Sequence, residues 1–376
     1  MKRKITEIEK DYITRNMPLY IRFGVCECFQ INKIINSLKE VIKKYPSLRS
    51  VIKDNYIIAQ KDYDVDITEC EKIQDDQRIF KYKLDPKKNL VKLLFSKEKS
   101  GTHFLMIIHH AICDAVSASL VIEDFVQGLF LPKKLEKNET IPKSIEDFFE
   151  YLPTKEQTGK YAKSFKENLA KINKYPIEAS EDCKSLKMKI FQVEKKQLEK
   201  ILKFAKEKDV TVNSLISAML IKALKLEGVY FVGNTVDLKR RMKNVPLDHF
   251  INAPVVAYIY LDLKKDASIE DIAKKYQVKL YELIDSDDFL CQHYSQRRGQ
   301  LRIFDYDTGF FMSNIGKTHF SKNIEEKISY LYFSLEVCAN FPMVFCATHL
   351  DKMIFSFSFQ EKFSSSIDEM MSAFQD

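Results

Sequence analysis

The segment Thr102–Leu131 joins a short apolar run, a polar turn and a longer amphipathic stretch. The apolar run, Phe104–Ile108, is too short for a membrane span and is typical of a strand buried on both faces. Asp114 stands at an N-cap position, where its carboxylate can accept backbone N–H bonds. After it, apolar residues recur at helical spacing, namely Val116, Leu120, Val121, Phe125, Leu129 and Phe130. The segment therefore predicts a buried strand, a polar turn and a helix that packs back on the strand.

Two histidines, His109 and His110, stand between the strand and Asp114. Side chains alternate along a strand, so we expect His110 on the same face as Met106 and His109 on the opposite face. An imidazole that leaves an apolar strand beside a carboxylate is a candidate general base. A histidine in such a place is also often a hydrogen-bonded core residue, and an aspartate after it is often only a helix cap. Cys113 offers a thiol nucleophile in the same turn, although packing within the turn is its simpler role.

A metal site is another interpretation of these histidines. His103 and His109 share strand parity, but the six residues between these positions correspond to roughly 20 Å along a strand, which is too far for both to hold one ion. No glutamate follows His110 at helical spacing. We therefore expect no metal.

Composition excludes several classes of protein. With 376 residues, 45% of them hydrophobic, the chain can form two domains or one large one. The longest apolar stretches, such as Ala253–Leu261, fall well short of the roughly 20 residues that a membrane helix needs, and the basic N-terminus lacks the apolar region of a secretory signal.

Cysteine and charge patterns narrow the setting further. The 8 cysteines are scattered without a CxxC pair, which suits a reducing compartment and argues against a zinc ribbon. The net charge of +7 is dispersed among acidic residues, which is typical of a solvated surface rather than of a nucleic-acid-binding stripe. We expect a monomeric cytoplasmic protein with no transmembrane segment and no nucleic-acid partner.

The turn sequence HHAICDA, residues 109–115, resembles the HHxxxDG motif of the acyltransferase superfamily with the chloramphenicol-acetyltransferase-like fold. That superfamily includes alcohol acetyltransferases, polyketide-associated acyltransferases, plant acyltransferases and peptide-synthetase condensation domains. The resemblance implies that His110 is the catalytic base, and that His109 and Asp114 support the turn, Asp114 through an ion pair. Ala115 replaces the usual glycine, which is tolerable if that position is helical and troublesome if it needs positive φ.

Two later segments also resemble the superfamily. VDLKRRM, residues 236–242, is similar to a V-D-L-R-x-x-L segment whose arginine pairs with the aspartate of the histidine motif. Lys239 stands at that position and cannot form the bidentate guanidinium contact, and a shift in register would let Arg240 serve instead. FMSNIG, residues 311–316, matches the S-N-L-G segment. Because acyl transfer needs an oxyanion donor, Ser313 and Asn314 are candidates there, with plain strand-end hydrogen bonding as the simpler role.

The resemblance covers nearly the whole chain in order and implies an α/β (α+β) fold. We expect two chloramphenicol-acetyltransferase-like subdomains, each a mixed β-sheet flanked by helices, with a tunnel between them. The N-terminal subdomain would span residues 1–175 and carry HHAICDA, residues 176–186 would form a linker, and residues 187–376 would form the C-terminal subdomain.

Three functional classes remain open. The first is an O-acyltransferase that moves an acyl group from a thioester, with acyl-CoA as co-substrate and no bound cofactor, to a small-molecule alcohol. The second is a condensation-type enzyme that uses a carrier-protein thioester. The third is a non-catalytic relative that binds an acyl ligand or a partner protein, which Ala115 and Lys239 favour. We predict the first, with His110 as general base.

Overall fold

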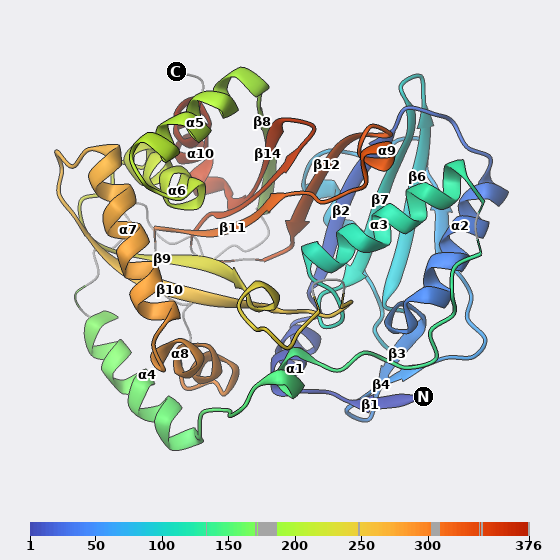
Figure 1. The fold of residues 1–376 in the computed structure, drawn as a ribbon, viewed down its shortest axis with the longest axis horizontal. Coiled ribbons are helices and arrows are strands. Elements are labelled where there is room, and N and C mark those ends of the chain that lie inside the picture. The colour runs from blue at the N-terminus through green and yellow to red at the C-terminus, as the bar shows by residue number, and fades with distance from the viewer. Residues whose placement is uncertain are drawn as a thin grey trace.

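The computed structural model of the protein describes residues 1–132, 134–169, 171, 186–246, 249–301, 309–337, 339 and 341–374. Two mixed β-sheets flanked by helices lie side by side (Figure 1). This arrangement confirms the predicted fold class. The predicted linker, residues 176–186, lies outside the described residues except for Leu186, where strand β8 begins.

The first sheet has five strands in the order β12-β2-β7-β6-β5, all antiparallel except the pair β5–β6. Its strands are β2 (Pro18–Val25), β5 (Ile67–Glu69), β6 (Val91–Glu98), β7 (Gly101–His109) and β12 (Ile328–Leu335). The predicted buried strand is β7, and its two faces enter different clusters: Phe104 and Met106 pack in one, Leu105 and Ile107 in the other. Apolar residues on both faces are therefore what hold this strand at the centre of the sheet.

Helices α2 (Ile31–Lys44) and α3 (Ala115–Phe130) contact each other and contribute to the same core as Phe104. Helix α2 ends before Pro46, which cannot continue a helix. Helix α3 begins after Asp114, as the cap predicts. A small antiparallel sheet completes this half, with the order β1-β4-β3; its strands are β1 (Lys2–Lys4), β3 (Ser50–Lys53) and β4 (Tyr56–Ala59).

The second sheet has six strands in the order β10-β9-β11-β13-β14-β8. Its strands are β8 (Leu186–Val193), β9 (Gly228–Asp237), β10 (Pro254–Leu263), β11 (Phe310–Lys317), β13 (Met343–His349) and β14 (Lys352–Gln360). Strand β11 is parallel to both of its neighbours, β9 and β13, and the other pairs are antiparallel. The accompanying helices are α5 (Lys195–Glu207), α6 (Val212–Ala223), α7 (Ile269–Ile284), α8 (Asp288–Arg297) and α10 (Ser364–Ser372). Helix α9 (Lys322–Glu325) instead contacts α3 in the first half.

Three further elements cross the predicted division of the chain. Strand β12 comes from the C-terminal half but pairs with β2 in the first sheet. Helix α4 (Lys155–Leu169) comes from the N-terminal half but packs on α8 (Figure 1). Helix α1 (Glu7–Thr14) also contacts α8. The two halves therefore exchange elements and meet along a shared boundary.

A 3₁₀ turn lies between α3 and α4. The region from Ile145 to Leu152 forms only a 3₁₀ turn, Ile145–Phe148, capped by the side chains of Ser144 and Asp147. Helix α7 begins directly after Ser268, and the Ser268–Asp271 capping box accounts for its start.

Candidate active site

The turn after β7 places His110 at the boundary between the two sheets. His110 is 7% exposed, and its Nδ1 lies 2.8 Å from the carbonyl oxygen of Cys113. A carbonyl oxygen can only accept, so Nδ1 carries the proton and donates it. The other ring nitrogen, Nε2, then bears the lone pair, which is the protonation state that a general base needs.

Asp114 holds the turn and the start of α3 together. Its Oδ1 accepts a 2.6 Å hydrogen bond from the Ser117 backbone N–H, which is the expected N-cap contact. Its Oδ2 accepts a 3.1 Å bond from the Ala253 backbone N–H, from the opposite half of the molecule. Ala115 is the first residue of α3 and has no positive φ. The replacement of glycine by alanine is therefore accommodated without backbone strain.

Lys239, and not Arg240, reaches Asp114. The Lys239 Nζ lies 3.4 Å from Asp114 Oδ1, with the two side chains 0% and 6% exposed, and it donates a 3.0 Å bond to the Ser117 hydroxyl. Leu238–Arg240 is a 3₁₀ turn rather than a strand. Arg240 pairs with Asp237 at 3.5 Å and is half exposed.

A cavity of about 140 Å³ lies between the two halves and is lined by His110. One wall is apolar and comes from the ends of β11, β12 and β13; it includes Phe311, Ile315, Phe333, Leu335, Met343 and Phe345. The opposite wall is polar and comes from α1 and α8; it includes Asp11, Tyr12, Arg15, His293 and Arg297. An apolar cavity with a few convergent polar groups is typical of a small-molecule site.

Ser313 and Asn314 both line this cavity. Asn314 lies at an irregularity in the pairing of β11 with β13, and its Oδ1 accepts a 2.9 Å bond from the Gly316 backbone N–H. That contact orients the side-chain amide, whose NH₂ group is a hydrogen-bond donor. The structure thus brings His110, Arg240, Ser313 and Asn314 to one cavity, while His109 and Lys239 lie behind it in the protein interior.

Tyr12, His293 and Arg297 are cavity residues that the sequence patterns did not reveal. The Tyr12 ring lies on the His110 ring, with centroids 4.5 Å apart. The sequence holds one signal for α1: Thr6 and Glu9 form a capping box, which indicates the start of a helix.

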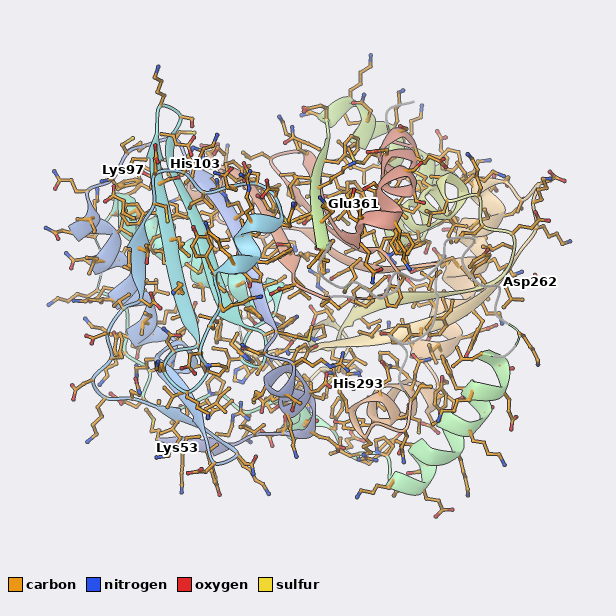
Figure 2. The ribbon with its side chains drawn as sticks, turned by 180° about the vertical axis from the view of Figure 1, so that it is seen from behind. Lys53, Lys97, His103, Asp262, His293 and Glu361 are labelled. Atoms are coloured by element: carbon orange, nitrogen blue, oxygen red, sulfur yellow. The ribbon has the colours of Figure 1, made fainter. Side chains whose placement is uncertain are left out.

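Figure 2 shows His293 toward the middle of the molecule, with Lys53 and Lys97 on one half and Asp262 on the other.

Burial governs the charge state of these imidazoles. It lowers the pKa of His110, and the Asp114 carboxylate and the Cys113 carbonyl only partly oppose this effect. Burial likewise lowers the pKa of His293 well below its ordinary value. His110 is therefore neutral at pH 7 and able to accept a proton.

His109 makes stability depend on pH. Burial lowers its pKa from 6.5 to about 3, so below pH 6.5 the unfolded chain binds a proton that the folded protein excludes. His109 is then expected to contribute a fall of about 1.4 kcal/mol per pH unit to the free energy of unfolding as pH drops from 6.5 toward 3. This adds to the contributions of the other buried histidines, and the stability due to neutral His109 is fully present above pH 6.5. Urea unfolding at pH 7.5, 5.5 and 4.5 measures this slope.

His109→Gln should reduce the slope, and the same substitution at the exposed His319 is the matched control and should leave it unchanged. Equal slopes in wild type and His109→Gln would contradict the assignment.

Cys113 is expected to be chemically inert. It is fully buried, and burial raises the pKa of its thiol well above the ordinary value, which suppresses the reactive thiolate. Iodoacetamide at pH 7.5 should modify the exposed Cys26 and Cys28 and leave Cys113 unmodified, as peptide mass spectrometry would show. Cys113→Ala should change the rate of acyl transfer by less than about 3-fold, since a nucleophile would cost far more. A loss on the scale of His110→Ala would restore the nucleophile hypothesis.

Among the described residues, no group of three or more histidine, cysteine or acidic side chains is placed to hold a metal ion. In the same part of the chain, every helix is too short or too polar to cross a bilayer.

Comparisons with known proteins agree on the fold. The structure superposes on trichothecene 15-O-acetyltransferase TRI3 from Fusarium sporotrichioides with a TM-score of 0.77, 10% identity and coverage of 99% of this chain and 95% of that chain. Polyketide synthase associated protein 5 from Mycobacterium tuberculosis gives a TM-score of 0.72 at 13% identity, covering 99% and 97%. The epimerization domain from the third module of tyrocidine synthetase B gives 0.69 at 16% identity, covering 100% and 96%.

Sequence comparison points to the same family. Bacitracin synthase 3 from Bacillus licheniformis is 26% identical in an alignment 188 residues long that covers 43% of this chain and 3% of that protein. The chain thus spans a small part of the length of this curated relative. The family model of the condensation domain matches residues 9–226, more than half of the 376 residues. The protein therefore belongs to the condensation-domain family.

Proposed function

We propose that the protein transfers an acyl group from a thioester donor, acyl-CoA, to the hydroxyl of a small alcohol, with His110 as general base. The observation that carries this proposal is the placement of His110: its Nδ1–H is tied to the Cys113 carbonyl, and its ring lines a cavity between the two halves. That arrangement leaves Nε2 to take a proton from an acceptor in the cavity. The superposition on an O-acetyltransferase supports the fold that such transfer requires.

In the proposed reaction, the acceptor hydroxyl attacks the thioester carbonyl while its proton passes to His110 Nε2. The resulting tetrahedral intermediate collapses with cleavage of the C–S bond, and the imidazolium returns the proton to the departing thiolate. The products are an ester and a free thiol. Ser313 and the Asn314 amide are the proposed donors to the oxyanion, because both line the cavity on the side of β11. The apolar ends of β11, β12 and β13 would contact the acyl chain.

A carrier-protein thioester is the second candidate donor, and the match to the condensation-domain model favours it. The two donors share the same acyl chemistry at His110 and differ in what lies beyond the sulfur. A non-catalytic role is less well supported, because Ala115 lies in unstrained helix and Lys239 still pairs with Asp114.

Thiol release decides among these functions. Purified protein is mixed with acyl-CoAs of increasing chain length and a panel of alcohols, and in parallel with the same acyl groups loaded on a carrier protein. Ester formation from acyl-CoA supports the proposal. Transfer from the carrier with refusal of acyl-CoA would identify the condensation-type enzyme, and absence of ester and thiol from both donors would contradict an acyltransferase.

A further inference from the structure

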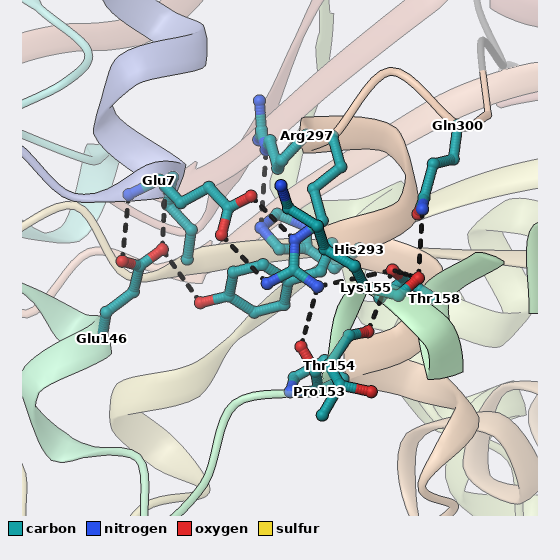
Figure 3. Close-up of polar contacts among 12 residues, drawn as sticks. Glu7, Glu146, Pro153, Thr154, Lys155, Thr158, His293, Arg297 and Gln300 are labelled. Carbon is teal, nitrogen blue, oxygen red and sulfur yellow. Dashed lines mark hydrogen bonds and ion pairs between the residues drawn. The ribbon is translucent and has the colours of Figure 1, made fainter.

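A cluster of charged and aromatic side chains lies beside His110, on the polar wall of the cavity. Helix α8 contributes His293 and Arg297 (Figure 3). Helix α1 contributes Asp11 and Tyr12. Arg297 forms an ion pair with Asp11, and its Nε–H points at His293 Nε2 from 3.5 Å. The Arg297 side chain is 11% exposed, so its charge acts in a largely dry environment.

The cluster is connected to His110 by stacked groups. The guanidinium carbon of Arg297 lies 4.8 Å from the centroid of the Tyr12 ring, and the Tyr12 ring lies 4.5 Å from that of His110, tilted by 32°. Cation–π and aromatic contacts of this kind have defined geometry. The hydrogen bond from His110 Nδ1 to Cys113 holds one edge of the imidazole, and the Tyr12 ring covers its face. Together they restrict the plane in which Nε2 can point.

We propose that Arg297 is a positioning residue which, through Tyr12, holds the His110 ring in the orientation required for proton abstraction. Because Arg297 belongs to α8 and Tyr12 to α1, the orientation of the base depends on the docking of the C-terminal half against the N-terminal helix. This inference rests on the proposed role of His110 as general base.

Arg298 provides a matched control on the same pair of helices. It forms a two-pronged ion pair with Glu7 of α1, with Nε–Oε1 at 2.8 Å and Nη2–Oε2 at 3.1 Å, and donates a 2.7 Å bond to the Pro153 carbonyl. Neither Arg298 nor its partner Glu7 lines the cavity. Loss of Arg298 therefore weakens α1–α8 docking by a comparable ion pair without touching Tyr12 or His110.

The charges that face His110 determine how its titration responds. Asp114, paired with Lys239, lies on the same turn as His110, and β7 contributes the neutral His109. Helix α1 contributes Asp11 and Tyr12, and α8 contributes Arg297 and His293. Arg15, Asp237 and Arg240 line the same cavity. Arg297 disfavours the imidazolium and so lowers the pKa of His110. Removing that cation while Asp11 stays should raise the pKa of His110, and the acidic limb of the rate profile should move to higher pH.

The test compares Arg297→Gln, Arg297→Lys and Arg298→Gln in steady-state acyl transfer between pH 5 and 9. For Arg297→Gln we expect a loss in kcat of roughly 10- to 100-fold, the scale of a misplaced catalytic group, with the acidic limb moved to higher pH. Arg297→Lys should return the limb toward its wild-type position and recover part of kcat. Arg298→Gln should stay within about 3-fold of wild type with an unchanged limb. Equal losses in Arg297→Gln and Arg298→Gln would overturn the proposal, because α1–α8 docking alone would then explain both.

Substitutions of Tyr12 provide a second test of the proposal. Tyr12→Phe should retain the stack and the rate, and Tyr12→Ala should lose about as much as Arg297→Gln. If Arg297 acts through Tyr12, the double variant Tyr12→Ala/Arg297→Gln should lose little more than either single variant. Multiplied losses in the double variant would overturn the proposed route.

A spectroscopic arm separates this inference from the proposed function. In protein carrying ¹³C-labelled histidine, the His110 signal is assigned by its disappearance in His110→Ala. The nuclear Overhauser effect between the His110 and Tyr12 rings should persist in Arg298→Gln and weaken in Arg297→Gln. If it persists in both variants, the inference is overturned even if acyl transfer is observed. Transfer that is unaffected by His110→Ala would instead remove the proposed function, whatever the Tyr12 contact does.

Discussion

His110→Ala is expected to lower kcat for acyl transfer by roughly 10²- to 10⁴-fold, the contribution of a positioned general base. The reason is geometric: Nε2 of His110 is the imidazole nitrogen that remains available in the cavity once Nδ1 is committed to Cys113. The rate of thiol release from acyl-CoA in the presence of alcohol measures the effect. The substitution should leave KM for the donor within a few-fold, because the imidazole acts on the acceptor's proton.

His293→Ala is the informative comparison, since His293 lines the same cavity but its Nε2 is approached by Arg297. It should cost much less than His110→Ala. Thiol release that survives in His110→Ala at the wild-type rate would remove the imidazole from the mechanism, and a larger loss in His293→Ala would move the base to the other side of the cavity.

The second large effect is on stability. Lys239→Met is expected to lower the free energy of unfolding by about 3–5 kcal/mol, because it leaves the buried Asp114 carboxylate without its compensating cation. The pair is almost completely removed from solvent, with side chains 0% and 6% exposed. Urea unfolding at pH 7.5, followed by circular dichroism, measures the change.

Two comparisons sharpen this prediction. Arg240→Met removes the neighbouring cation, whose ion pair with Asp237 is half exposed, and should cost no more than about 1 kcal/mol. The double variant Lys239→Met/Asp114→Asn should be more stable than Lys239→Met alone, because no unpaired buried charge remains. A cost below about 1 kcal/mol for Lys239→Met would show that hydrogen bonds from Ser117 and Ala253 suffice to hold the carboxylate.

The sequence pattern could not decide whether Lys239 or Arg240 contacts Asp114. On a strand, the two side chains would point to opposite faces, and either one could be assigned to the interior by a shift of register. The 3₁₀ turn Leu238–Arg240 instead directs Lys239 to Asp114 and leaves Arg240 at the cavity edge with Asp237. A lysine in the place of arginine gives a point contact of 3.4 Å, and the Ser117 hydroxyl completes its coordination.

The sequence pattern could predict the features that depend on local contacts. Strand β7, the Asp114 cap of α3 and the full extent of α7 follow from residues a few positions apart, because side-chain alternation, capping and helical periodicity act within one or two turns of chain. The HHAICDA turn belongs to this group, since the Nδ1 contact of His110 is made only three residues away, at Cys113.

The surroundings of that turn were decided by tertiary structure. Strand β12 joins the first sheet from 328–335, Tyr12 covers His110, and Arg297 reaches Asp11 across a gap of hundreds of residues. No periodicity in the chain encodes such meetings, because they depend on which distant surfaces bury apolar area and pair charges when the two halves dock. The residue pattern thus identifies the candidate base, whereas packing between the halves creates the cavity and sets the ring's orientation and pKa.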